Sequence, residues 1–141
     1  MLRVMAEAPV ELLKRVPLFS GLGDRELKQI AQSMKERTFS AGDTVTAEGK
    51  GGVGFFVIDE GSARVSVGGK DVRTFGPGDY FGEVGLIADI DRTATITAET
   101  DLRCYGMTFW DFCPLVESNA AIPWKMLQTM AQRLKEAEQG R

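Results

Sequence analysis

The sequence contains no histidine, only two cysteines and only five prolines. Histidine is the commonest metal ligand and the side chain that most often exchanges protons near neutral pH, so its absence argues against an enzyme. Cys104 and Cys113 are too few for a disulfide framework and do not have CxxC spacing. A reduced, cytoplasmic setting is therefore the simplest interpretation.

An excess of basic residues and a long apolar run are also missing. The chain has 17 basic and 20 acidic residues, a net charge of −3 and a pI of about 5.1. This balance gives no general attraction to nucleic acid. No apolar run approaches the ~20 residues that cross a bilayer, and the N-terminal stretch soon becomes acidic, unlike a signal peptide. We therefore expect neither nucleic acid nor membrane as a direct partner.

What remains is ordinary globular composition. The 141 residues are 43% hydrophobic and 26% charged, which is typical of a single domain with its own core. We find no internal repeat or linker, and we expect one domain over residues 1–141. Its parts are predicted as N-terminal helices (9–34), a β-barrel (37–109) and C-terminal helices (111–138).

The first part has helical spacing. VELLKRV, residues 10–16, follows Pro9 and predicts a helix that ends near Pro17. A second helix is predicted to begin with Asp24 as its N-cap. Its apolar stripe, which we interpret as core packing, consists of Leu27, Ile30, Ala31 and Met34.

From Arg37 onward the pattern is typical of β-strands. Short segments rich in β-branched and aromatic residues are separated by glycine turns. Gly68-Gly69, between SARVSV and KDVRTF, predicts a two-residue hairpin. The strand-like segments are RTF, TVTA, FFVID, SARVSV, KDVRTF, ATITAET and LRCYGMTF. Many short strands at this spacing favour a jelly-roll or a related barrel.

A glycine-rich stretch, residues 49–54, fits the pattern GxGxxG. In nucleotide-binding folds this pattern precedes a helix whose N-terminus meets the phosphate. Here it precedes Phe55, Phe56, Val57 and Ile58, which indicate a strand. We interpret the stretch as a hairpin loop.

The C-terminal part predicts a short helix over Asp111–Ser118, interrupted by Pro114, and an amphipathic helix over Ile122–Glu138. The second helix carries a narrow apolar seam, which can pack on its own barrel, pair with a second copy or close over a ligand as a lid. Packing on the barrel is the simplest of the three. The seam residues are Trp124, Leu127, Ala131 and Leu134.

Residues 80–95, YFGEVGLIADIDRTAT, combine a tight backbone with an acid and a base. Gly82 and Gly85 permit close approach of backbone or ligand. The first N–H groups of a helix over VGLI would form an anion site, which Arg92 can close with its planar guanidinium. Glu83 would accept hydrogen bonds from neighbouring hydroxyls. The alternative is that Glu83 and Arg92 form an ordinary surface ion pair.

This stretch resembles the phosphate-binding cassette of cyclic nucleotide-binding domains, of the type in cAMP receptor protein and protein kinase A regulatory subunits. The segments AGDTVTAEG, FFVIDEGSARV and FGPGDYFGE follow the same family's succession of strands and turns, and the resemblance covers residues 9–138. It implies a mainly β fold with flanking helices: a double-stranded β-helix (jelly-roll) barrel with N-terminal helices, a short phosphate-binding helix and a C-terminal amphipathic helix. Residues 80–95 are called the cassette below.

The resemblance also implies how the cassette residues divide between two parts of a ligand. One group would bind the ribose 2′-hydroxyl and the other would hold the cyclic phosphate, with the hydroxyl at position 93 also able to reach a guanine base. The ribose group is Gly82 and Glu83; the phosphate group is Val84, Gly85, Arg92, Thr93 and Ala94. A lid over the base would consist of Trp124, Leu127 and Met130.

The expected function is a non-enzymatic sensor that binds a cyclic mononucleotide, cAMP in preference to cGMP, and relays its occupancy through the C-terminal helix. No metal, other cofactor or catalytic residue is expected. A homodimer through the C-terminal helix or an effector protein is the expected partner. The alternative is a protein-interaction scaffold with an unused pocket, which Asp89 and Asp91 favour because acidic side chains near a bound anion weaken its binding.

Overall fold

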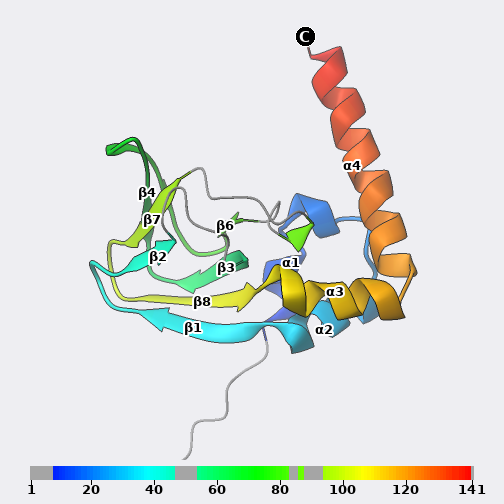
Figure 1. Ribbon diagram of the computed structural model, residues 1–141, viewed down its shortest axis with the longest axis horizontal. Helices are drawn as coiled ribbons and strands as arrows, with labels where there is room; N and C mark the ends of the chain where they lie inside the picture. The colour runs from blue at the N-terminus through cyan, green and yellow to red at the C-terminus, as the bar shows by residue number, and fades with distance from the viewer. Residues whose placement is uncertain (1–7, 47–53, 83–85, 88–93, 141) are drawn as a thin grey trace, which may run out of the picture.

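The computed structural model describes residues 8–46, 54–82, 86–87 and 94–140. Two antiparallel sheets lie at one end of the molecule and the helices gather at the other (Figure 1). The strands are β1 (Lys35–Phe39), β2 (Thr44–Thr46), β3 (Phe55–Glu60), β4 (Ala63–Val67), β5 (Lys70–Phe75), β6 (Tyr80–Phe81), β7 (Thr95–Ala98) and β8 (Leu102–Met107). The helices are α1 (Val10–Leu13), the 3-10 turn η1 (Pro17–Phe19), α2 (Asp24–Ser33), α3 (Phe109–Ser118) and α4 (Ala121–Gln139).

The two sheets have four strands each among the described residues, in the orders β1-β8-β3-β6 and β2-β7-β4-β5. All strand pairs are antiparallel, and neighbours in a sheet are often distant in sequence, as in a jelly-roll. The predicted fold class, mainly β with flanking helices, is therefore confirmed.

The side chains of strand β3 contribute to two separate hydrophobic cores. Successive side chains of a strand point to opposite faces. Phe55 and Val57 lie in the core shared with the helices, whereas Phe56 and Ile58 lie in the core between the sheets. All four are buried, which accounts for the unbroken FFVI run. The strand at Phe55 also confirms that no helix follows the glycine-rich stretch, of which residues 49–53 lie outside the described residues.

The predicted hairpin at Gly68-Gly69 is confirmed. Val67 pairs with Lys70, and the two glycines have φ values of 58° and 81°. Two consecutive positive φ values are typical of a type I′ turn, which side chains other than glycine and asparagine rarely adopt.

The N-terminal helices differ in detail from the expectation. Helix α1 ends at Leu13, so the prediction that it reaches Val16 is wrong, although Val16 is fully buried. Gly23, not Asp24, is the N-cap of α2. Asp24 is instead the first helical residue, where a negative charge favours the helix dipole and lies 3.6 Å from the Lys14 ammonium. The predicted apolar stripe of α2 is buried, as expected.

The predicted boundary between the last strand and the following helix is also wrong, because α3 begins at Phe109 and not at Asp111. Strand β8 ends at Met107, because Thr108 caps α3: its hydroxyl accepts the Asp111 N–H at 3.0 Å, and the Asp111 carboxylate accepts the Thr108 N–H at 3.1 Å. Pro114 does not interrupt the helix. The residue four positions before Pro114, whose carbonyl would accept the missing N–H, is Trp110, and it is 72% exposed.

Helix α4 extends well away from the rest of the molecule (Figure 1). Ile122 and Met126 are its buried residues. The prediction that the seam packs on the barrel is wrong, because Trp124, Leu127 and Leu134 are 63%, 55% and 60% exposed. Residues 131–140 are exposed throughout, so α4 rests on the body only through its first half.

Candidate functional site

The cassette connects the two sheets. It begins in β6 of one sheet and ends in β7 of the other, so its ends are fixed by strands from different layers. Gly82 and Ala94 are the predicted binding residues that the structure places, at these two ends, and both are half-buried. Five of the predicted binding residues lie outside the described residues: Glu83, Val84, Gly85, Arg92 and Thr93.

Gly82 follows β6 directly and has a φ of 82°. This left-handed conformation disfavours a side chain, so the backbone turns sharply out of the strand at the first predicted ribose contact. The glycine that the sequence pattern singled out is therefore required by the local backbone. That Gly82 contacts the ribose of a ligand remains a prediction.

A hollow of about 370 Å³ adjoins Gly82. Phe81, on its floor, stacks on Phe75 with ring centroids 5.6 Å apart and on Phe56 at 5.3 Å. We call it the Gly82 hollow; it is lined by Arg73, Phe75, Asp79, Tyr80, Phe81 and Gly82. The lining combines aromatic side chains with the Arg73 guanidinium and the Asp79 carboxylate, so it can offer a ligand both apolar contact and charge-assisted hydrogen bonds.

The turn that leads into the Gly82 hollow is firmly held. The Asp79 carboxylate accepts the Gly76 N–H at 2.8 Å. The Ile58 N–H donates to the Asp79 carbonyl, and the Gly78 N–H donates to the Ile58 carbonyl, both at 2.8 Å. These bonds fix the chain between β5 and β6 on β3. The guanidinium of Arg73 lies 5.6 Å from the centre of the Phe75 ring, where a cation–π attraction adds to the order.

Sequence reasoning missed Arg73 and Phe75. The available signal was the period of two in KDVRTF, which places these two side chains on one face of β5. The turn at residues 76–79 then folds that face back toward Tyr80–Gly82. Only the register of this turn, which the sequence pattern does not specify, brings them to the beginning of the cassette.

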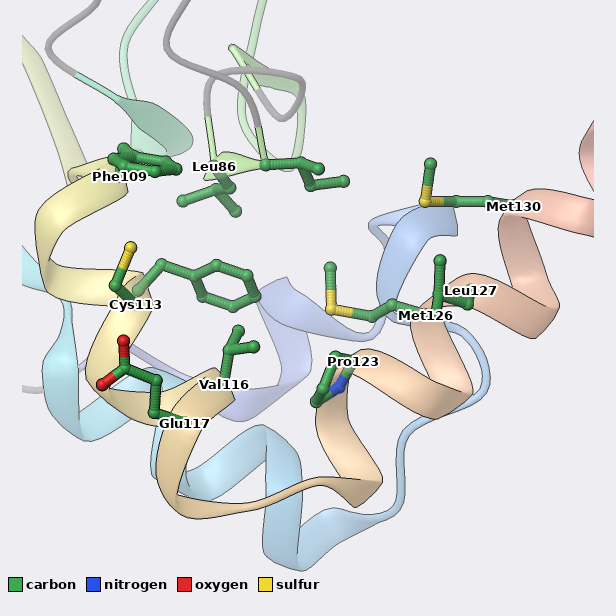
Figure 2. Close-up of a pocket in the computed structure, with 11 residues that line it drawn as sticks. Leu86, Phe109, Cys113, Val116, Glu117, Pro123, Met126, Leu127 and Met130 are labelled. Atoms are coloured by element: carbon green, nitrogen blue, oxygen red, sulfur yellow. The ribbon is translucent and has the colours of Figure 1, made fainter.

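A second hollow, of about 250 Å³, lies between the cassette and the C-terminal helices (Figure 2). Leu86 forms one wall, and side chains from α3 and α4 form the others. We call it the helix hollow; its lining is Leu86, Ile87, Phe109, Phe112, Cys113, Val116, Glu117, Pro123, Met126, Leu127 and Met130. Glu117 is the only charged residue of this lining, so the hollow is suited to apolar side chains.

The three predicted lid residues are therefore divided. Leu127 and Met130 line the helix hollow together with Leu86, whereas Trp124 points elsewhere and is 63% exposed. No residue lines both hollows among those described. The structure thus brings two lid candidates to the cassette at Leu86 but not to the Gly82 hollow.

Cys104 lines neither of the two hollows. Burial raises the pKa of the Cys104 thiol to about 12, but Cys104 lies in the core between the sheets. Within residues 8–46, 54–82, 86–87 and 94–140, no three cysteine or acidic side chains gather closely enough to hold a metal ion. Among the helices that the structure describes, none is both long enough and apolar enough to span a membrane.

Comparison with known proteins gives matches in sequence and structure. The family model described as the cyclic nucleotide-binding domain matches residues 36–119. A cAMP-dependent protein kinase regulatory subunit from Yarrowia lipolytica is 40% identical over 93 residues, which are 64% of this chain and 25% of that protein. The chain therefore spans about a quarter of the length of this curated relative.

Two solved structures resemble the fold. The N-terminal domain of a transcriptional regulator from Streptomyces coelicolor A3(2) matches with a TM-score of 0.84 and 29% identity, over 89% of this chain and 94% of that one. The cAMP-bound PfPKA-R structure matches with a TM-score of 0.66 and 26% identity, over 92% of this chain and 46% of that one. The match to the first structure includes almost all of that domain.

Proposed function

This chain belongs to the cyclic nucleotide-binding domain family, and we propose that it is a single sensor domain, over residues 1–141, that binds a cyclic mononucleotide without transforming it. The observation that carries this proposal is the sharp backbone turn at Gly82, at the beginning of the cassette and beside an aromatic hollow that contains Arg73. A planar base with a charged phosphate fits this combination of groups.

The cassette residues would divide the ligand as the sequence suggests. Glu83, next to Gly82, accepts hydrogen bonds from the ribose 2′-hydroxyl. Arg92, the Ala94 N–H and the amides near Gly85 hold the phosphate, since charge-assisted bonds are about twice as strong as neutral ones. Val84 contributes through its backbone, and the Thr93 hydroxyl contacts the phosphate or the base.

Among cyclic nucleotides we propose cAMP over cGMP. The matched kinase subunit is described as cAMP-dependent, and the matched PfPKA-R structure contains cAMP. The choice within this chain depends on contacts to the base edge, to which lid residues such as Leu127 and Met130 contribute.

Binding would be relayed through α4. Leu86 belongs to the cassette and also lines the helix hollow, so a change in the cassette alters the wall against which α4 lies. For this to act as a signal, the ligand must favour one pose of α4 over another. The partner that reads the pose is an effector protein or a second copy of the chain, in a cytoplasmic setting.

Calorimetric titration with cAMP and with cGMP tests the proposal. We expect binding to cAMP, and loss of about 10- to 150-fold in affinity for Arg92→Ala, the value of a hydrogen bond to a charged group. Arg25→Ala, which removes the same charge from the exposed face of α2, is the matched control and should bind as the wild type does.

A protein-interaction scaffold with an unused pocket is the second candidate. Asp89 and Asp91 favour it, because two carboxylates in the cassette repel an anion if they face it. Absence of both heat and thermal shift at millimolar cAMP and cGMP would support this candidate and refute the sensor.

A further inference from the structure

Helix α4 contacts the body along three adjacent strips of its surface. At about 3.6 residues per turn, Lys125 and Leu127 lie about 160° apart around the helix axis. Ile122 and Met126 fall between them and are fully buried. Leu127 faces the helix hollow, whereas Lys125 lines a cleft on the opposite side, near Gly21. The buried pair is thus a ridge with empty space on one side and a polar contact on the other.

The polar contact is an ion pair between Lys125 and Glu26 of α2. The Glu26 side chain is 11% exposed and that of Lys125 is 38% exposed, so water screens the pair only in part. Lys125, followed by hydrogen bonds from the backbone N–H groups of Glu26 and Gly23, lowers the pKa of the Glu26 carboxyl below its ordinary value. Glu26 lies in the first turn of α2, and Lys125 is the longer and more flexible partner.

Two further contacts hold the same end of α4. The Asn119 side-chain amide, just before the helix, donates to the Gln29 side-chain oxygen of α2 at 2.9 Å. Gly21 lies so close to α4 that a Cβ there would be 3.1 Å from the Thr129 hydroxyl. Both contacts lie toward α2 and η1, as the ion pair does, and neither faces the helix hollow.

We propose that the ion pair between Glu26 and Lys125 is a tether that opposes movement of α4 into the helix hollow, and thereby sets the affinity of the sensor for its nucleotide. The affinity part of this proposal rests on the proposed function. A shift of α4 into the helix hollow, which brings Leu127 and Met130 closer to Leu86, carries the backbone at Lys125 away from α2, because the two strips lie on opposite sides of the ridge. It would leave the Glu26 carboxylate nearly buried without its cation, which is unfavourable.

Lys125→Met tests the tether, because it keeps the length of the side chain and removes its charge. We expect cAMP to bind about 5- to 10-fold more tightly, at the lower end of known couplings between sites. Loss of a positive charge by itself weakens the binding of an anion, so an increase in affinity has the opposite sign to the simple electrostatic effect. Lys135→Met, on the exposed end of α4, is the charge-matched control and should not increase affinity.

Glu26→Gln removes the same ion pair from the other side and should also tighten the binding of cAMP. The glutamine keeps the size of the side chain and one carbonyl oxygen. Because both substitutions remove one interaction, the double variant should bind no more tightly than the stronger single variant. Unchanged or weaker binding in both single variants, relative to Lys135→Met, would overturn the effect on affinity.

A measurement without nucleotide separates this proposal from the function on which it rests. Hydrogen exchange of the amides in residues 121–130 should be faster in Lys125→Met than in Lys135→Met. In a Trp110→Phe background, Trp124 is the single tryptophan and its fluorescence should also shift. If the wild type binds neither nucleotide, the proposed function is wrong. Hydrogen exchange and fluorescence then still test whether the ion pair holds α4 in place. Exchange and fluorescence equal to the control would refute it.

Discussion

The two sheets and helix α4 differ sharply in how they are held. Strand β3 buries four of its six residues, and its neighbour β8 buries five of six. Helix α4 has 19 residues, of which Ile122 and Met126 are buried. Within the first sheet, Arg103 of β8 also contacts Asp59 and Glu60 of β3, each at 2.8 Å.

Under the proposed function, the two regions have different tasks: the cassette would hold the ligand and α4 would report its presence. The two ends of the cassette, at Gly82 and Ala94, adjoin strands β6 and β7, which are hydrogen-bonded into the two sheets. Helix α4 rests on a short buried ridge beside an apolar hollow, and residues 131–140 of its second half are exposed. A segment with few buried contacts opens or moves at low cost, as elements that transmit signals must.

The largest expected effect is on the free energy of unfolding, when a side chain that packs between the sheets and the helices is removed. Phe55 is fully buried and meets the Phe19 ring edge-on at 5.6 Å. Phe55→Ala should lower the free energy of unfolding by about 3–5 kcal/mol, measured by urea denaturation. Leu134→Ala, on the exposed half of α4, should change it by less than about 0.5 kcal/mol. Equal effects would contradict the difference between the regions.

The two thiols report on the same difference kinetically. Cys104 lies in the core between the sheets, and its pKa of about 12 keeps it protonated at pH 8; Cys113 is half-buried and lines the helix hollow. We expect Cys113 to react with Ellman's reagent at least about 100-fold faster, since Cys104 must wait for the sheets to open. Cys113→Ser should abolish the fast phase, and a fast phase that survives would contradict the burial of Cys104.

The smallest effect on stability is expected at Thr108, which connects strand β8 to helix α3. Thr108→Ala removes the hydroxyl that caps α3 and should cost about 1 kcal/mol of unfolding free energy. Thr108→Ser keeps the hydroxyl and should retain most of that stability. If serine and alanine are equally destabilising, the methyl group rather than the cap stabilises the joint.

Much of the fold could be predicted because its signals are local. The glycine pair at residues 68–69 dictates a hairpin, and the stripe on α2 dictates which side faces the core. The residues at which strands and helices begin and end were harder to predict, because a residue at a boundary can belong to either of two neighbouring elements. Thr108 could extend β8 or cap α3, and its exchange of hydrogen bonds with Asp111 decides for the cap.

The site was less predictable than the fold. The cassette pattern identifies Gly82, which has a positive φ in the structure, but no pattern in the sequence indicates that Arg73 and Phe75 lie beside it. Their placement depends on the turn between β5 and β6. The exposed seam of α4 shows the same limit, since a periodicity states that residues share a face but not what that face contacts.

The hairpin between β4 and β5 has a practical consequence. A Cβ built on either Gly68 or Gly69 would meet no other atom within 4 Å, so the tip of the hairpin is open space. Exposed tips of this kind are the places where inserted domains are best tolerated. A fluorescent protein inserted between these two glycines would therefore leave the cassette unmodified. With a partner fluorophore attached to the exposed end of α4, the domain would report changes in the distance between the hairpin and this helix.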